Sequence, residues 1–223
     1  MMVRIAHAFD VFDAHIRAVK GLLPLFIDMT NMRAAVFGAG PVGVRKANYL
    51  AQEAEVAAVA LRFAEGLDPR VRTIKADIRE SMNEWLEWAD LVVAATDNME
   101  TNALLAAEAS KRGKPFNRAD GASTFFIPSV VARDGYTVAI STHGRSPAMS
   151  RFLRLKLEKD LDERYGLMVR LQEELREAAR GTLSSQLERE RYLRSVLDDE
   201  EVWRLLERDY EGAKELALSR MVD

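Results

Sequence analysis

The sequence predicts an α/β protein in which a parallel β-sheet is covered by helices on both faces and is followed by a short β-hairpin and a helical tail. Three observations predict this fold class. Apolar runs alternate with helical segments between residues 33 and 118, an Asp-Gly pair divides two β-rich runs at residues 125–141, and a helical pattern extends from Pro147 almost to the end of the chain. Alternating strands and helices with short joins are typical of a parallel sheet that is buried on both sides.

The sheet domain is expected to be built from apolar strands at residues 33–37, 56–60, 71–75, 91–95 and 114–118. Helices are expected at residues 44–52 and 99–112, and Gly113 closes the second of them. Ahead of the first strand, a short amphipathic helix is predicted, because apolar residues recur there at near-helical spacing, at Phe9, Phe12, Ile16 and Val19.

The chain changes character near Asp120. Residues 125–133 and 136–141 are β-rich, and they flank Asp134-Gly135. An Asp-Gly pair between runs of alternating apolar residues is among the strongest short signals for a hairpin. A β-hairpin is therefore predicted between the sheet domain and the helical tail.

The helical tail is interrupted at residues 181–185 and is expected to restart with a cap formed by Asp198 and Glu201. No internal repeat or long linker separates it from the hairpin. Three domains are therefore predicted: a nucleotide-binding domain with its N-terminal helix at residues 1–118, a β segment at 119–146, and a helical domain at 147–223.

Composition excludes several classes of protein. The chain has 223 residues, of which 48% are hydrophobic and 30% charged, as in ordinary globular proteins. A formal net charge of −3 argues against a nucleic-acid partner, and the absence of cysteine excludes disulfides and thiolate sites. No apolar run reaches the roughly 20 residues that span a bilayer, and no signal-peptide core is recognisable. We therefore expect a cytoplasmic protein with no membrane partner.

A glycine-rich loop joins the first predicted strand to the first helix and reads Gly38-x-Gly40-x-x-Gly43. This strand–turn–helix context is the one that a dinucleotide-binding motif requires. The first glycine permits the tight turn, the second lets the backbone approach a pyrophosphate, and the third lets the helix pack on the strand. The helix N-terminus adds free N–H groups for the phosphates. We predict cofactor contacts at Gly38, Gly40, Pro41, Val42 and Gly43, with a purely structural turn as the alternative.

The carboxylate that ordinarily bonds the adenosine ribose at the end of the second strand is missing. That stretch reads Ala60-Leu61-Arg62-Phe63. Arg62 is either an isolated surface residue or a partner for the 2′-phosphate of NADP. The residues alone leave the choice between NAD and NADP open.

Thr96 and Asp97 follow the fourth strand at its carboxyl end, where open α/β sheets bind ligands. Polar side chains at this place can contact the nicotinamide half of a dinucleotide. The alternative is that Asp97 caps the helix that begins at Met99, because Asp is favoured at helix starts.

Two further residues are candidates for chemistry. Asp120 follows the fifth strand, where a carboxylate can act as a base toward a substrate held over the nicotinamide, although Asp-Gly is also ordinary turn chemistry. His143 lies in the polar loop at residues 141–147 and is either solvated or catalytic. Without cysteine or clustered histidines, a metal site is not expected. The basic residues Arg45, Lys46 and Arg145 either cover a solvated face or bind several carboxylates.

Four stretches together resemble the precorrin-2 dehydrogenase family, whose sequences also form the N-terminal part of siroheme synthases. The stretches are Leu23–Asp28, Gly38–Ala47, Val92–Asp97 with Asn102, and Ser123–Ser129 followed by Ala139–Pro147. The resemblance covers residues 23–156 well and the helical tail loosely.

The resemblance implies a Rossmann domain, a β dimerisation segment in which partners exchange strands, and a helical C-terminal domain. It implies a homodimer that uses NAD to oxidise a tetrapyrrole substrate, precorrin-2, to sirohydrochlorin. It makes Asp120 the essential aspartate rather than a turn residue. Substrate contacts are then expected at Arg45, Lys46, Ser123, Ser141, Thr142, His143 and Arg145. At His143 the family often has a small residue.

Two alternatives remain. In the first, the enzyme also inserts Fe(II) into sirohydrochlorin, as some relatives do with the same aspartate. In the second, which belongs to a different class, the chain is a nucleotide-sensing regulatory domain of the potassium-channel type. Such domains share the glycine loop, but they normally keep the acidic ribose ligand and lack a segment like residues 125–147.

Overall fold

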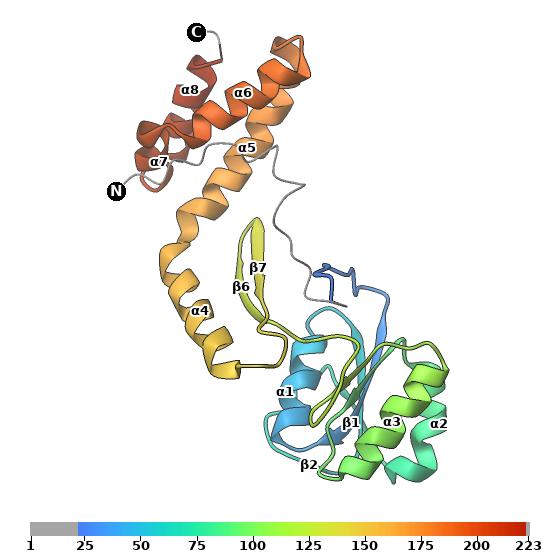
Figure 1. Cartoon of the computed structure of the whole chain (residues 1–223). Coiled ribbons are helices and arrows are strands. Elements are labelled where there is room, and N and C mark those ends of the chain that lie inside the picture. The colour runs from blue at the N-terminus through green and yellow to red at the C-terminus, as the bar shows by residue number, and fades with distance from the viewer. Residues whose placement is uncertain (1–21, 222–223) are drawn as a thin grey trace. The chain divides into compact units, whose positions relative to one another are not determined.

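The computed structural model describes residues 22–221, and the chain divides into two compact units between Ser123 and Thr124 (Figure 1). The first unit contains the parallel sheet, and the second contains both the hairpin and the helical tail. The amphipathic helix predicted around Phe9 and Ile16 lies outside the described residues.

The first unit is built on a sheet of parallel strands in the order β3-β2-β1-β4-β5, which confirms the predicted α/β class. The strands are β1 (Arg33–Ala39), β2 (Glu55–Phe63), β3 (Arg72–Lys75), β4 (Leu91–Ala94) and β5 (Phe116–Arg118). Each lies within about three residues of its predicted position. β2 continues from the expected end at Ala60 to Phe63, which pairs with Ala39, so Arg62 belongs to the strand rather than to the loop after it.

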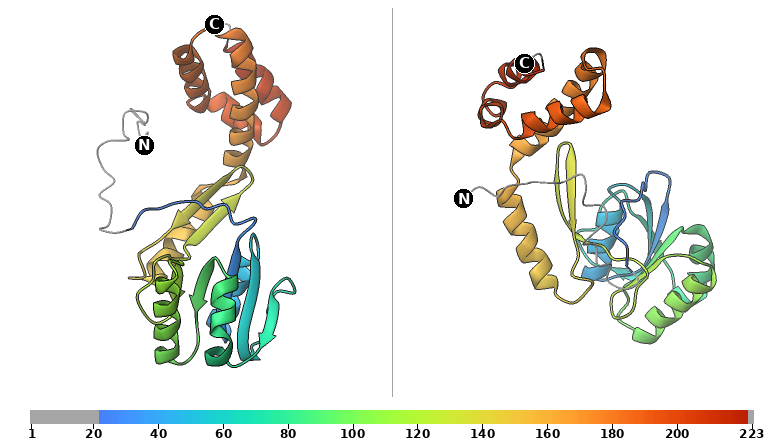
Figure 2. Two further views of the ribbon diagram at one scale, coloured as in Figure 1. Left: turned by 90° about the vertical axis from the view of Figure 1, so that its right-hand side faces the viewer. Right: turned by 45° about the horizontal axis from the view of Figure 1, so that its top comes forward.

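Three helices cover the sheet (Figure 1, Figure 2). They are α1 (Pro41–Leu50) on one face, and α2 (Ile78–Trp88) and α3 (Met99–Lys111) on the other. α1 begins at Pro41, earlier than the predicted Val44, because proline suits the first helical position, where its missing N–H is not needed. Gly113 follows α3 with a φ of +67°, a conformation that glycine adopts without strain.

α2 is absent from the predicted helices. Its signal is a capping Asp77, whose side chain accepts a hydrogen bond from the Arg79 N–H, followed by a face that buries Trp85 and Leu86. These two side chains pack with Phe37 of β1 and Leu105 of α3 in the core between the sheet and its two helices.

The strand order reverses at β1, because β2 lies on one side of it and β4 on the other. Such a switch point opens a crevice at the carboxyl ends of the two central strands, where ligands of open α/β sheets bind. The glycine loop follows β1, and Thr96 and Asp97 follow β4, so both predicted cofactor segments lie at this crevice.

In the second unit, β6 (Ser129–Arg133) and β7 (Tyr136–Ile140) form the predicted antiparallel hairpin. Gly135 has a φ of +82° in the turn. β6 begins at Ser129 rather than at the predicted residue 125, since Pro128 has no N–H for a strand ladder. The hairpin packs against α4 (Pro147–Asp160), and the Tyr136 hydroxyl donates a hydrogen bond to the Leu161 carbonyl at 3.1 Å.

The helical tail continues with α5 (Glu163–Thr182), α6 (Gln186–Leu197), α7 (Glu200–Leu206) and α8 (Tyr210–Ser219). Ser185 and Glu188 form a capping box at α6. The cap expected at Asp198 is wrong by one residue: Asp198 ends α6, and Asp199 accepts the N–H groups that open α7. Within residues 22–221, every helix is too short or too polar to cross a bilayer.

Candidate active site

The glycine loop has its shape because side chains are excluded at two positions. Gly38 has a φ of +93°, and a Cβ atom there would overlap the carbonyl oxygen of Ala95 on the neighbouring segment. A Cβ at Gly43 would overlap the Gly38 carbonyl oxygen in the same way. These two glycines therefore let the loop turn tightly and let α1 pack directly behind it, as the motif predicts.

Gly40 differs, because apart from its neighbours along the chain no atom lies within 4 Å of the place where its Cβ would be. It is the N-cap of α1, with no side-chain hydrogen bond to the helix and no acidic residue in the first turn. Pro41 and Val42 are exposed beside it. An open, positively polarised helix start of this kind suits a pyrophosphate, so the residues present fit a dinucleotide.

A cavity of about 940 Å³ extends from this loop along the carboxyl edge of the sheet. The loop residues Gly38–Val42 line one part of it, residues 60–64 of β2 and the following turn line another, and Ala95–Asn98 with Ala119 line a third. Both halves of a dinucleotide thus have a candidate surface within a single cavity.

The ribose end of this cavity has no carboxylate on β2, and Arg62 lines it instead. Asp77 and Arg79, at the start of α2, line the same cavity. One oxygen of Asp77 is already occupied, because Oδ1 accepts the Arg79 N–H at 2.8 Å. Two arginines and one aspartate therefore line this part of the cavity, and the choice between NAD and NADP stays open on the residues alone.

Thr96 and Asp97 both line the cavity. The cap of α3 is Asn98, whose Oδ1 accepts the Thr101 N–H at 2.8 Å, so the alternative that Asp97 caps this helix is wrong. The Thr96 hydroxyl donates to the Asn102 side-chain oxygen at 2.8 Å. The Asp97 side chain is left available for a ligand, because no capping bond engages it.

Asp120 lies in a network of hydrogen bonds after β5. Its Oδ1 accepts from Nε of Arg118 at 3.0 Å, and its Oδ2 accepts from Nδ2 of Asn102 at 3.0 Å. Burial acts to raise the pKa of Asp120, but the hydrogen bonds from Asn102 and Arg118 and the charge of Arg118 outweigh it and lower that pKa. The carboxylate is ionised at neutral pH and can accept a proton.

The two basic residues predicted on α1 point in different directions. Lys46 is half-buried and donates to Oδ1 of the buried Asn117 at 2.5 Å. Burial and the neighbouring Arg45 lower the pKa of Lys46, and the charge of Asp120 partly restores it. Lys46 therefore belongs to the electrostatic surroundings of Asp120.

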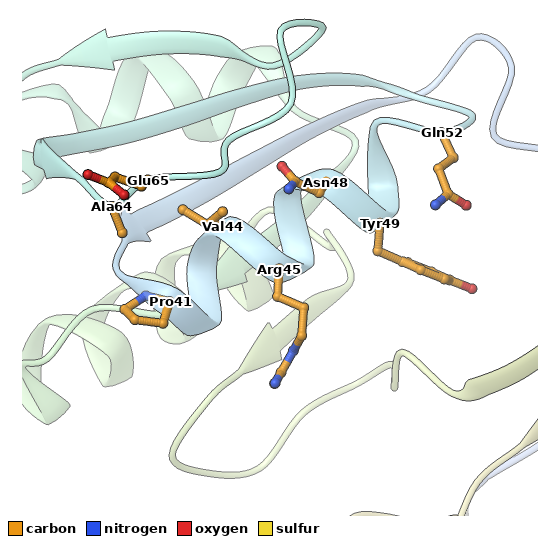
Figure 3. Close-up of a pocket in the computed structure, with 8 residues that line it drawn as sticks. All are labelled: Pro41, Val44, Arg45, Asn48, Tyr49, Gln52, Ala64 and Glu65. Atoms are coloured by element: carbon orange, nitrogen blue, oxygen red, sulfur yellow. The ribbon is translucent and has the colours of Figure 1, made fainter. Parts of the chain in front are cut away.

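Arg45 projects from the outer side of α1 beside Tyr49 (Figure 3). It lines a second surface cavity of about 800 Å³, which shares Pro41 and Ala64 with the dinucleotide cavity. This second cavity includes Asn48, Gln52 and Glu65 but none of the residues around Asp120. Arg45 is exposed, and burial raises the pKa of Tyr49 next to it. The structure thus separates Arg45 from Lys46, although the two are adjacent in the sequence.

Ser123 closes the loop that contains Asp120. Its hydroxyl oxygen accepts the Arg118 N–H at 2.9 Å, which brings the end of the first unit back onto β5. The structure therefore gives Ser123 a role in holding the loop, in addition to the substrate contact that the resemblance implies.

The remaining predicted substrate residues lie in the second unit, in the loop between β7 and α4. The Thr142 hydroxyl donates to the Ser146 carbonyl at 3.0 Å, and the His143 N–H donates to the Ser141 hydroxyl at 3.1 Å. His143 has a φ of +56°, a conformation uncommon for a residue with a side chain. The Arg145 side chain is exposed. These contacts fix a loop of defined shape around His143.

Asn102 and Asn117 are the two site residues to which residue-by-residue reasoning gave no chemical role. Both are buried polar side chains, with exposures of 1% and 5%. The signal for Asn102 is its spacing, because it shares a helix face with Leu105, Ala106 and Ala109 of the core. A polar residue at such a position needs internal hydrogen-bond partners. Among residues 22–221, no group of acidic or histidine side chains could hold a metal ion.

Comparison with known proteins gives a consistent set of relatives. A family model described as putative NAD(P)-binding matches residues 25–129. A precorrin-2 dehydrogenase of Methanosarcina barkeri is 34% identical over 207 residues, which are 89% of this chain and 92% of that protein. A siroheme synthase of Methylococcus capsulatus is 29% identical over 79% of this chain, which spans only 38% of that longer protein. A solved structure titled "SirC, precorrin-2 dehydrogenase" matches with a TM-score of 0.67 at 22% identity, covering 87% of this chain and 99% of that one, and supports the fold.

Proposed function

This chain belongs to the precorrin-2 dehydrogenase family, and from that membership we propose that it oxidises precorrin-2 to sirohydrochlorin with NAD in siroheme biosynthesis. Bound NAD supplies the acceptor for one hydride from the substrate. The same oxidation releases one proton and forms a new double bond that extends the conjugation of the macrocycle. The chain must therefore bind a dinucleotide, hold a tetrapyrrole and accept a proton.

The observation that best supports this reaction is the position of the Asp120 carboxylate. It is ionised, and it is tied through Asn102 to Thr96, which lines the dinucleotide cavity. A base beside a cofactor cavity is what a combined hydride and proton transfer needs. In this proposal Asp120 accepts the proton that leaves the substrate and passes it to water.

The other residues of the first unit have binding roles in this proposal. The N–H groups at the start of α1 bind the pyrophosphate, and the lack of a side chain at Gly40 leaves room for it. Thr96 and Asp97 contact the nicotinamide half. The ammonium group of Lys46 keeps donors beyond the one given to Asn117 and can bind a substrate carboxylate.

From the family we also propose how this chain assembles and which of its residues contact the substrate. Residues 119–146 act as the dimerisation segment of a homodimer located in the cytoplasm. The tetrapyrrole is contacted by Arg45, Ser123, Ser141, Thr142, His143 and Arg145. Of these residues, Arg45 and Arg145 are exposed, and their guanidinium groups are suited to the carboxylates of the substrate.

Insertion of Fe(II) into sirohydrochlorin is a second activity consistent with the similarity to siroheme synthases. In that case the ion is a substrate, and Asp120 would take up the protons that leave the macrocycle. Membership of this family argues against the alternative that the chain is a nucleotide-sensing regulatory domain.

The decisive experiment is anaerobic turnover of enzymatically generated precorrin-2 with NAD, followed by the absorbance of sirohydrochlorin and of reduced nicotinamide. We expect the two products in equal amounts. Nucleotide binding without conversion would contradict the proposed function. Adding Fe(II) to the finished reaction tests the second activity, which predicts faster loss of sirohydrochlorin with the protein than without it.

A further inference from the structure

Asn102 is a buried amide at the middle of the site, and all four of its hydrogen-bonding positions are used. Its Oδ1 accepts the Thr96 N–H at 3.0 Å and the Thr96 hydroxyl at 2.8 Å. Its Nδ2 donates to the Thr96 carbonyl at 3.1 Å and to Oδ2 of Asp120 at 3.0 Å. The side chain is 1% exposed, so water does not compete for these bonds.

This arrangement admits only one orientation of the amide. A carboxylate accepts hydrogen bonds and does not donate them, so the NH₂ group must face Asp120. The Thr96 N–H must in turn face the amide oxygen. Exchanging the two ends of the amide would break bonds at both residues.

The two partners of Asn102 serve different parts of the reaction. Thr96 lines the dinucleotide cavity, and Asp120 carries the carboxylate that accepts the proton in the proposed function. We propose that Asn102 is a positioning residue, whose amide holds the cofactor-side residue Thr96 and the base Asp120 in one fixed arrangement. This inference rests on the proposed function and adds a residue that sets its geometry.

The uncharged NH₂ group of Asn102 also influences whether Asp120 is ionised. The hydrogen bond from Nδ2 favours the ionised form of Asp120. Asn102→Asp keeps the size of the side chain and both acceptor bonds from Thr96, but it replaces the donor with a second carboxylate oxygen. Two carboxylates about 3 Å apart resist double ionisation, so the pair should retain a proton to higher pH.

The first test compares the wild type with Asn102→Asp and Asn102→Ala in steady-state kinetics from pH 5 to pH 8. We expect kcat to fall about tenfold to a hundredfold, because small errors in placing a base are costly. The KM for precorrin-2 should change less than about threefold, since neither variant is expected to alter the substrate contacts. In Asn102→Asp, an acidic limb should appear in the profile of kcat/KM within this range, whereas the wild type should show none from Asp120.

The control is Leu105→Val, which lies about one turn later on α3 and is fully buried in the apolar core between the sheet and its helices. It should lower the melting temperature of the protein and leave the pH profile unchanged. If Leu105→Val shifts the profile as far as Asn102→Asp does, then Asn102 merely stabilises α3 and the proposal is overturned.

The second test does not depend on turnover. Carbon-13 NMR of labelled aspartate carboxyl groups, with the Asp120 signal identified by its loss in Asp120→Asn, follows the ionisation directly. In the wild type this signal should titrate below the ordinary range of an aspartate, whereas in Asn102→Asp a titration shared by the two carboxyl groups should appear at clearly higher pH. If Asn102→Asp does not fold, Asn102→Ala takes its place in this test. In that variant we expect a smaller upward shift of the pKa of Asp120.

The outcomes separate the two proposals. Titration of Asp120 at the wild-type pH in every folded Asn102 variant would overturn the positioning role, whatever the activity. A shifted titration in a protein that does not oxidise precorrin-2 would support the role of Asn102 in holding Asp120 and would reject the proposed function instead.

Discussion

Arg118 donates from Nε to Oδ1 of Asp120 at 3.0 Å, and the two side chains are only 18% and 21% exposed. An ion pair in this partly sheltered position is less screened by solvent than a surface pair. Together with the hydrogen bond from Asn102, it offsets the effect of burial and keeps the pKa of Asp120 below its ordinary value. Four experiments follow from this relationship and from the shape of the dinucleotide cavity.

The pH profile should depend on Arg118. Because the pKa of Asp120 is lowered, the base is ionised across pH 5–8, and kcat/KM should show no acidic limb from Asp120 in that range. Arg118→Gln removes both the charge and the Nε donor, so the pKa should rise and the limb should move toward neutral pH. The control Arg112→Gln removes an ion pair with Glu108 on α3 and should leave the profile unchanged. An identical profile for Arg118→Gln and the wild type would contradict this account.

Asp120→Asn should lower kcat by about 10²-fold to 10⁴-fold, which is the usual contribution of a positioned base. The affinity for NAD, measured by calorimetry, should stay within about twofold, since the side chain is not among the residues that line the cavity. Asp68→Asn is the matched control, because it alters an aspartate paired with Arg70 in the same unit, away from the cavity. Turnover that survives in Asp120→Asn would return Asp120 to a turn residue.

The glycine loop gives two variants with opposite consequences. Gly40→Ala places its methyl group in open space, so we expect an unchanged melting temperature together with a weaker affinity for NAD. Gly38→Ala creates an overlap with the Ala95 carbonyl at a positive φ and should destabilise the first unit by about 2 kcal/mol or more. Thermal unfolding and a nucleotide titration measure both effects. A loss of stability in Gly40→Ala without loss of NAD binding would refute the assignment of the pyrophosphate site.

Arg62 should influence the choice between the two nicotinamide dinucleotides. It lines the ribose end of the cavity, and an arginine there attracts a 2′-phosphate. Arg62→Asp should weaken NADP at least about tenfold and leave NAD unchanged or slightly stronger, because a carboxylate repels the phosphate but bonds ribose hydroxyls. The measurement is the ratio of kcat/KM for the two cofactors. An unchanged ratio would identify Arg62 as a solvated residue.

The parts of the fold that the sequence predicts are those in which local pattern and tertiary packing agree. The strands are continuous apolar runs because both faces of the sheet are covered, and the hairpin is fixed by Asp134-Gly135. α2 escapes prediction because its apolar residues are spread among charged ones and its clearest sign is a single capping residue, Asp77.

The candidate site was predictable only in part for a similar reason. The glycine loop is a local motif, so it can be recognised along the chain. The hydrogen bonds of Asn102 join Thr96 to Asp120, which lie 24 residues apart, and such a link appears only when α3 and the end of β5 are in place. Arg45 and Lys46 show the opposite case. They are adjacent in the sequence, but neighbouring residues on a helix point in different directions and so lie in different surroundings.

The tip of the β6–β7 hairpin packs closely against α5. A Cβ at Gly166 would overlap the Asp134 carbonyl oxygen, and the Tyr136 hydroxyl bonds the chain between α4 and α5. A two-stranded hairpin has little stability of its own in water. Its amide protons should therefore exchange with deuterium only when the helices beneath it open. Hairpin and helices would then share one protection factor and unfold as a single cooperative unit.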